Sequence, residues 1–186
     1  MAIDARISEE TYQQIVLSDP NHKWELIEGW LREKPGMTWE HSRTVMLLGH
    51  ALLQQVDIDQ FSVFFESRVR WTAESIFIPE IAVVPATFGT EFQDRPGVLA
   101  IFSEPLPLVV EVWSVSTGDY DVDVKIPAYQ HRGDREIWRI HPYERTLISW
   151  QLQSDGSYVE TLYREGAVQP VALPGVVVEL EALFDT

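Results

Sequence analysis

An α/β fold of the α+β type, built on a mixed sheet, is predicted by three features of the sequence. Apolar residues recur at spacings of three and four from about His41 to Gln55, which is typical of an amphipathic helix. Apolar residues on both sides of Glu111, over residues 107–117, indicate a strand buried on both faces. The order helix, strand, strand, buried strand, helix, strand over about residues 41–140 favours a mixed core over a regular alternation.

Composition limits the class of protein. The 186 residues are enough for one domain with a sizeable core. There are 14 Lys and Arg against 29 Asp and Glu, a net charge of -15, which counts against avid nonspecific binding of DNA. Residues 121–145 balance five basic against five acidic side chains, so we expect this segment to be comparatively electropositive.

Cysteine is absent, which excludes disulfides, thiolate nucleophiles and cysteine-ligated metal centres. No window reaches the roughly 18 uncharged apolar residues that a membrane span needs. Residues 1–10 lack a basic-then-apolar signal pattern. We therefore expect a cytoplasmic protein that does not bind membranes.

The flanks of the core contain helix and turn signals. Ser8 precedes two acidic residues and is suited to cap a helix that ends by Asp19. Residues 23–33 alternate around Glu28-Gly29 and predict a hairpin, with its acids mostly at the surface. The predicted parts of one domain over 1–186 are an N-terminal helix and hairpin (7–34), a core (about 41–140) and a C-terminal β-hairpin extension (146–186).

Within the core, residues 61–71 alternate like one strand and residues 76–84 predict a second. After the buried strand, polar residues at intervals of four predict one face of a helix that ends at Gly133. Pro127 removes a backbone donor from this helix, so a kink is expected. Residues 135–140 predict the last strand of the core.

Lone acids stand in two apolar runs, Glu111 in the buried strand and Glu80 in residues 78–84. An ionised carboxylate buried without a partner is so unfavourable that each must meet a cation, a metal or a proton, or else lie at an open strand end. A structural pair with an arginine is the alternative for Glu111. If the two strands are neighbours, the acids converge and suit Mg²⁺ or Mn²⁺, and Lys125 on the following helix adds an ammonium group.

At these positions the sequence resembles the Uma2-type restriction endonucleases, a former domain of unknown function (DUF820) that is abundant in cyanobacteria. The resemblance covers nearly the whole chain. It rests on the following segments, in order: Trp24-Glu25-Leu26-Ile27-Glu28-Gly29, Glu40-His41, Pro79-Glu80-Ile81-Ala82-Val83-Val84, residues 110–117, Asp121 to Lys125 through Tyr129, Glu136-Ile137-Trp138, Leu173-Pro174-Gly175 and Leu183-Phe184.

The resemblance implies a restriction-endonuclease-like core of the PD-(D/E)xK superfamily. The metal ligands that it implies are Glu80, Glu111 and the backbone carbonyl of Val112. Glu80 stands where the superfamily pattern usually has Asp, which keeps the charge but shifts the carboxylate oxygens. Trp113 stands where that pattern expects Lys, and Lys125 matches the lysine that Uma2 proteins carry on the next helix.

Three accessory residues complete the predicted site. Glu40 or His41, at the start of the long helix, matches a place from which such nucleases recruit an additional ligand. His41 as an ordinary polar residue at the helix entry is the alternative. Asp121 lies one turn before Lys125, and the alternative there is an exposed ion pair worth a few tenths of a kcal/mol.

The function that follows from the resemblance is a Mg²⁺- or Mn²⁺-dependent endonuclease that hydrolyses phosphodiester bonds in DNA. Lys125 is expected to orient the attacking water or to stabilise the charge of the transition state. A homodimer that pools the 121–145 surfaces would help to contact DNA. The alternative is a catalytically inactive nuclease fold that serves as a binding or assembly module, because the chain is acidic and carries Glu80 in place of Asp. A small-molecule phosphoesterase has no dedicated motif in the sequence.

Overall fold

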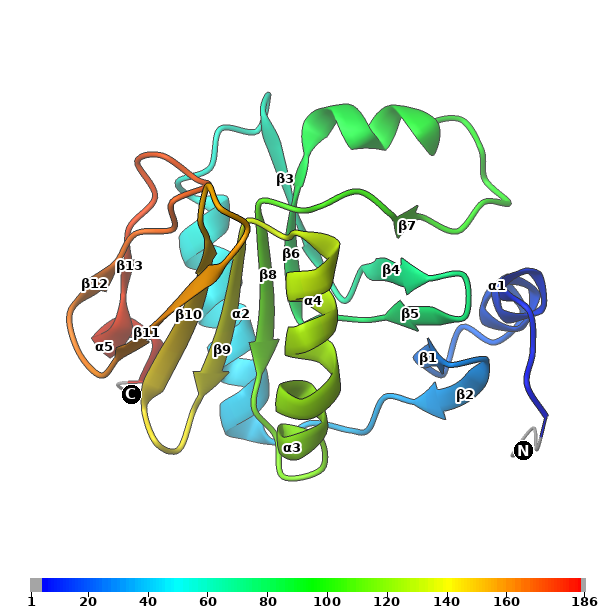
Figure 1. The fold of residues 1–186 in the computed structure, drawn as a ribbon, viewed down its shortest axis with the longest axis horizontal. Coiled ribbons are helices and arrows are strands. Elements are labelled where there is room, and N and C mark those ends of the chain that lie inside the picture. The colour runs from blue at the N-terminus through cyan, green and yellow to red at the C-terminus, as the bar shows by residue number, and fades with distance from the viewer. Residues whose placement is uncertain (1–4, 185–186) are drawn as a thin grey trace.

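The computed structural model describes residues 5–184, which form a mixed α+β fold with two principal sheets (Figure 1). The elements in chain order are α1 (Glu9–Ser18), β1 (Trp24–Ile27), β2 (Trp30–Glu33), α2 (Trp39–Leu53), β3 (Phe61–Phe65), β4 (Arg68–Thr72), β5 (Ser75–Phe77), β6 (Ile81–Pro85), the 3₁₀ helix η1 (Ala86–Glu91), β7 (Ile101–Phe102), β8 (Leu108–Val112), α3 (Gly118–Tyr120), the π-helical turn η2 (Asp121–Lys125), α4 (Ile126–Arg132), β9 (Glu136–His141), β10 (Thr146–Leu152), β11 (Tyr158–Tyr163), β12 (Ala167–Val168), β13 (Val178–Glu179) and α5 (Leu180–Phe184).

The larger sheet has the strand order β11-β10-β9-β8-β6-β3. β8 and β9 run parallel, and the other neighbours are antiparallel. α2 covers one face, where Leu48 and Leu52 join the same apolar cluster as Val110 of β8. α4 covers the other face, where Ala128 packs in a cluster with Val109 (Figure 1). The order α2, β3, β6, β8, α4, β9 reproduces the predicted core, and β8 is buried on both faces as expected.

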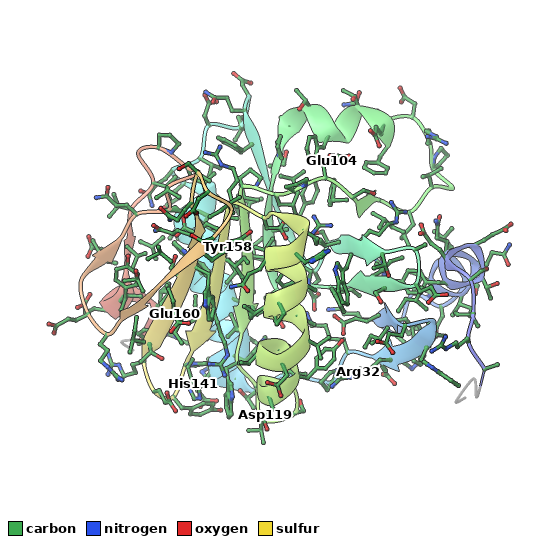
Figure 2. The ribbon with its side chains drawn as sticks, in the orientation of Figure 1. Arg32, Glu104, Asp119, His141, Tyr158 and Glu160 are labelled. Atoms are coloured by element: carbon green, nitrogen blue, oxygen red, sulfur yellow. The ribbon has the colours of Figure 1, made fainter. Side chains whose placement is uncertain are left out.

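The smaller sheet has the order β2-β1-β5-β4-β7, and α1 packs against it. β1 is a central strand here, because it pairs with β2 on one side and with β5 on the other. Arg32 of β2 lies with its guanidinium 3.8 Å from the centre of the Tyr120 ring, beside α3 (Figure 2). The N-terminal hairpin is therefore joined to the helical segment that follows β8.

The two long core strands that the alternation predicted are each interrupted, so those predictions were wrong. The first breaks after Phe65, where Glu66 has a positive φ of 52°, and β4 continues in the smaller sheet. The second breaks between Phe77 and Ile81 around Pro79, which has no N–H for a strand ladder. The chain thus crosses from the larger sheet to the smaller one and back.

Most local signals were correct. Ser8 caps α1 through a hydrogen bond that its Oγ accepts from the N–H of Thr11, and Glu28-Gly29 forms the hairpin turn with two positive φ angles. α2 begins earlier than expected, at Trp39, because Thr38 caps it. Pro127 stands in the first turn of α4, where a missing N–H is tolerated, and the π-helical turn η2 ends two residues before it; a kink at this proline stays a prediction.

No helix in residues 5–184 is both long and apolar enough to span a membrane.

Candidate active site

Glu80 and Glu111 meet across two neighbouring strands. β6 and β8 are antiparallel, with Ile81 opposite Val110, and this register continued by one residue places Glu80 opposite Glu111. Glu111 lies within β8, whereas Glu80 ends the link that leads into β6. Directly opposed side chains of like charge repel each other, so this pair needs compensation. Both carboxylates are buried, at 4% and 1% exposure.

The Glu111 carboxylate has two partners on the helical segment above it. Tyr129 of α4 donates a hydrogen bond of 2.6 Å to Glu111 Oε1, and the Lys125 ammonium lies 3.2 Å from the same oxygen. The predicted spacing of four residues along this segment brings both side chains to one face. Tyr129 therefore both packs in the core and contacts the site.

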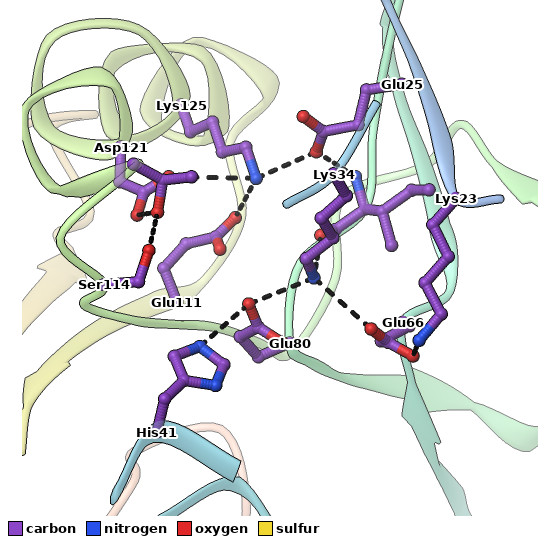
Figure 3. A network of polar contacts seen from close by, with 12 residues as sticks. Lys23, Glu25, Lys34, His41, Glu66, Glu80, Glu111, Ser114, Asp121 and Lys125 are labelled. Atoms are coloured by element: carbon purple, nitrogen blue, oxygen red, sulfur yellow. Dashed lines mark hydrogen bonds and ion pairs between the residues drawn. The ribbon is translucent and has the colours of Figure 1, made fainter. Parts of the chain in front are cut away.

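Lys125 joins three carboxylates rather than one (Figure 3). Its Nζ lies 2.8 Å from Glu25 Oε1, 3.2 Å from Glu111 Oε1 and 3.8 Å from Asp121 Oδ1. Asp121 accepts a further hydrogen bond of 3.0 Å from Thr117 Oγ1. Asp121 and Lys125 are each 2% exposed, so the alternative of an exposed helical ion pair was wrong.

Glu25 is a site residue that the sequence reasoning missed, because the hairpin acids were expected at the surface. It is buried in the central strand β1, and its Oε1 also accepts a hydrogen bond of 2.8 Å from the N–H of Ile78. This bond ties the smaller sheet to the link that carries Glu80. The available signal was the Trp24-Glu25-Leu26 motif of the resemblance.

The Glu80 carboxylate faces different partners (Figure 3). His41 Nε2 of α2 lies 3.2 Å from Glu80 Oε1, and Lys34 Nζ lies 3.0 Å from the same oxygen. Lys34 also donates to the carbonyl of Ile78 at 3.0 Å, and it was likewise missed from the sequence. His41 is buried, so it is a contact of Glu80 rather than a surface residue at the helix entry.

The two acids differ in their tendency to ionise. Burial opposes the charge of Glu80, but the hydrogen bond with His41 and the charge of Lys34 lower the pKa of Glu80 to about 2. For Glu111, burial outweighs the charge of Lys125 and raises the pKa to about 8. Burial also raises the pKa of Asp121, whereas the carboxylates around Lys125 overcome its burial and raise its pKa. A neutral Glu111 and an ionised Glu80 thus stand side by side.

Two further sequence expectations concern Glu40 and the surface of residues 121–145. Glu40 is exposed, and its carboxylate accepts a hydrogen bond of 2.9 Å from Tyr143 Oη rather than turning to the buried acids. Within residues 121–145, Lys125 is buried and the Arg132 side chain is 3% exposed in an ion pair with Asp134, whereas Arg135 and Arg145 are exposed, so an electropositive surface there stays a prediction.

A cavity of about 530 Å³ adjoins the Glu80 side of the site. Lys34 and His41, the two side chains that contact Glu80, both line it. Glu111 and Lys125 do not line the cavity. Lys34 and His41 thus stand between this cavity and the buried Glu80 carboxylate.

The donor set fits Mg²⁺ or Mn²⁺. Hard cations of this kind bind through one or two carboxylates and keep several waters, so they do not require a cage of many protein ligands. No group of three or more His, Asp or Glu side chains in residues 5–184 is arranged to hold a metal alone. However, the buried acids Glu25, Glu80, Glu111 and Asp121 outnumber the buried ammonium groups of the site. Burial is the main reason that the pKa of Glu111 is raised, and the neighbouring Asp121 adds to it; a divalent cation would compensate this surplus of acids.

Comparisons with known proteins agree with this fold. Residues 9–182 match a family profile described as "Uma2: Putative restriction endonuclease". A solved structure, described as "a putative nuclease belonging to DUF820 from Anabaena variabilis ATCC 29413", superposes with a TM-score of 0.67 at 20% identity, over 87% of this chain and 89% of that chain. At this identity the structural likeness shows the fold alone, and no curated protein matches. Because the profile spans nearly the whole sequence, the chain belongs to the Uma2 family of restriction-endonuclease-like proteins.

Proposed function

We propose that the protein is a Mg²⁺-dependent endonuclease that hydrolyses phosphodiester bonds in DNA. One observation carries the proposal: two buried carboxylates, Glu80 and Glu111, stand opposite each other with the Lys125 ammonium 3.2 Å from one of them. Family membership supports the reaction class, because the family is described as one of restriction endonucleases.

Glu80, Glu111 and the carbonyl of Val112 would hold the metal, which supplies a Lewis acid for the phosphodiester and lowers the pKa of a bound water. Lys125 stabilises negative charge that develops on the phosphoryl oxygens. Glu25 and Asp121 hold Lys125 in the charged form, and Tyr129 fixes the orientation of Glu111 through its hydrogen bond. The site thus contains a charged ammonium group, that of Lys125, and a carboxyl group of fixed orientation, that of Glu111.

The approach of the substrate depends on which residues of the site line the cavity. Lys34 contacts Glu80 from the wall of the cavity, so a phosphate that enters from there meets this ammonium group first. We infer that Lys34 binds the entering phosphate and that Lys125, buried next to Glu111, stabilises the charge at the reacting phosphorus. The homodimer remains a prediction, which light scattering coupled to size-exclusion chromatography tests.

Nicking of supercoiled plasmid DNA in Mg²⁺ and in EDTA tests the proposal. Glu111→Gln keeps the size of the side chain and a hydrogen-bond partner for Tyr129, and we expect it to lower the nicking rate by about 100-fold or more. Asp123→Asn is the matched control, because Asp123 lies on the same π-helical turn as Lys125 but is exposed. Equal rates for the wild type and the folded Glu111→Gln protein would overturn the proposal.

A noncatalytic binding module is the second candidate. It is favoured by a specific observation, because Lys34 and Lys125 already neutralise charge at both predicted ligands. As a module, the protein would yield no nicked product at any Mg²⁺ concentration, and Glu111→Gln would leave its partner binding intact. The plasmid assay therefore separates the two candidates.

A further inference from the structure

The cavity beside Glu80 has one apolar wall and one charged wall. Met37, Val45 and Phe65 supply apolar surface, and Lys23 and Lys34 supply ammonium groups that both pair with Glu66, a carboxylate of the same lining. Its volume of about 530 Å³ falls within the range of small-ligand sites, roughly 300–1,000 Å³. This combination suits a ligand with a flat apolar part and an anionic part.

Phe65 supplies the flat surface. It is the last residue of β3, and its ring packs directly against the backbone of α2 at Gly49. A Cβ at Gly49 would lie 2.2 Å from Cζ of this ring, so only glycine permits the contact. The residue remains 43% exposed, although the Cζ–Cε1 edge of its ring meets the helix. An aromatic ring that is held at one edge and belongs to an exposed residue can offer a face for stacking.

The anionic part of the ligand has matching donors near that ring. Lys23 forms an ion pair with Glu66, and Lys34 lies 3.8 Å from Glu66 and 3.0 Å from Glu80. His41 also lines the cavity, and its Nδ1 is buried without a hydrogen-bond partner. An unpartnered buried nitrogen is costly, but Nδ1 has almost no accessible surface, so it marks a polar group close to the cavity and not a contact for a ligand.

We propose that this cavity binds one unpaired nucleotide next to the cleaved phosphate, with its base on Phe65 and its phosphate at Lys23 and Lys34. The inference rests on the proposed nuclease function and narrows the substrate to DNA that is single-stranded or locally opened. Bases in an intact duplex are stacked on their neighbours, so a base must leave the helix to reach such a ring. A cavity of this size has room for one base and not for a double helix.

Paired substitutions on β3 test the subsite. Phe64 and Phe65 are neighbours with similar exposure, 40% and 43%, but they lie on opposite faces of the strand, and Phe64 packs near Phe102. Binding of a short fluorescein-labelled single-stranded oligodeoxynucleotide is measured by anisotropy, with Ca²⁺ in place of Mg²⁺. Loss of one base stack predicts roughly tenfold weaker binding for Phe65→Leu, and no change for Phe64→Leu.

Gly49→Ala provides a second test without removing the ring. The added methyl group displaces the Phe65 ring from the helix into the cavity, so we expect weaker oligonucleotide binding, while alanine favours the helix itself. Thermal melting checks that each variant is folded.

Equal effects of Phe64→Leu and Phe65→Leu would overturn the subsite, as would tighter binding of the matched duplex than of the single strand by the wild type. Failure of the proposed function looks different. If oligonucleotide binding depends on Phe65 but the wild type never nicks DNA, the nucleotide subsite stands and the proposed nuclease function is wrong. If Phe65→Leu nicks DNA and binds the oligonucleotide as well as the wild type does, the nuclease function stands and the nucleotide subsite is wrong.

Discussion

Glu80, directly before β6, and Glu111 of the neighbouring β8 lie in corresponding positions, yet their surroundings give them opposite charge states. Glu80 contacts His41 and Lys34 next to an open cavity, and its pKa is lowered to about 2. Glu111 lies in the closed interior, where burial raises its pKa to about 8 despite the adjacent Lys125. One carboxylate is thus permanently available as a charged ligand, and the other requires a further cation before it ionises near neutral pH.

Removal of Lys125 is expected to have the largest effect on stability. Lys125→Met leaves three buried carboxylates without their common cation, and such a loss costs about 3–5 kcal/mol of unfolding free energy. Chemical denaturation measures the change. We call Glu111 with Lys125, and Glu80 with Lys34, the two halves of the site. A cost below about 1 kcal/mol would show that water reaches the Glu111 half and that the two halves do not differ in burial.

The pH dependence of stability separates the two acids. Between about pH 4.5 and about pH 8 the folded chain keeps a proton on Glu111 that the unfolded chain releases, so the contribution of Glu111 falls as the pH rises. For Glu80 the sign is opposite: its contribution is present above about pH 4.5 and is lost as the pH falls toward 2.

Glu111→Gln isolates the first effect, because glutamine does not titrate. In EDTA, the unfolding free energy of the wild type minus that of Glu111→Gln should fall by on the order of a few kcal/mol from about pH 5 to about pH 8. Denaturant titrations at each pH give this difference. A difference that stays flat would mean that Glu111 is already ionised in the metal-free protein.

Removal of Lys34 is expected to cost less than removal of Lys125. After Lys34→Met, Glu80 keeps His41 as a partner, and the adjoining cavity lets water approach. We expect a loss of about 1–2 kcal/mol in unfolding free energy by denaturation. A loss as large as that of Lys125→Met would show that both halves are equally closed.

Thr117→Val should have the smallest effect. It removes the hydroxyl that donates to Asp121 Oδ2 at 3.0 Å and that also lies 2.8 Å from Ser114 Oγ, while it keeps the shape of the side chain. A single hydrogen bond of this kind is worth about 1 kcal/mol. Thermal unfolding measures the loss, and an unchanged melting temperature would mean that the Thr117 hydroxyl does not support the Glu111 half.

The sequence predicted the core order and the position of Lys125 on the helix after β8, and it left the pairing of the two acidic strands as a condition that the structure meets. These features follow from local patterns: an apolar run around a single acid, and polar residues spaced four apart on one helix. The strand breaks after Phe65 and around Pro79 were not predicted, because the residues on both sides alternate or stay apolar regardless of which sheet receives them.

The burial of Glu25 and Lys34 could not be read from the hairpin itself. An isolated hairpin has a solvated face, so its acids are expected there. β1 becomes a central strand only because Leu26 pairs with Ile76 of β5, a contact between residues distant in the sequence. Long-range pairing thus decides which charged residues belong to the site.

Calorimetric titration of Mn²⁺ into the wild type, Glu80→Gln and Glu111→Gln tests most directly whether the two halves act together on one cation. Shared ligation predicts binding to the wild type with proton release, since Glu111 must ionise, and loss of binding in both variants. Absence of binding to the wild type, or unchanged binding after either substitution, would contradict a shared cation at these two carboxylates.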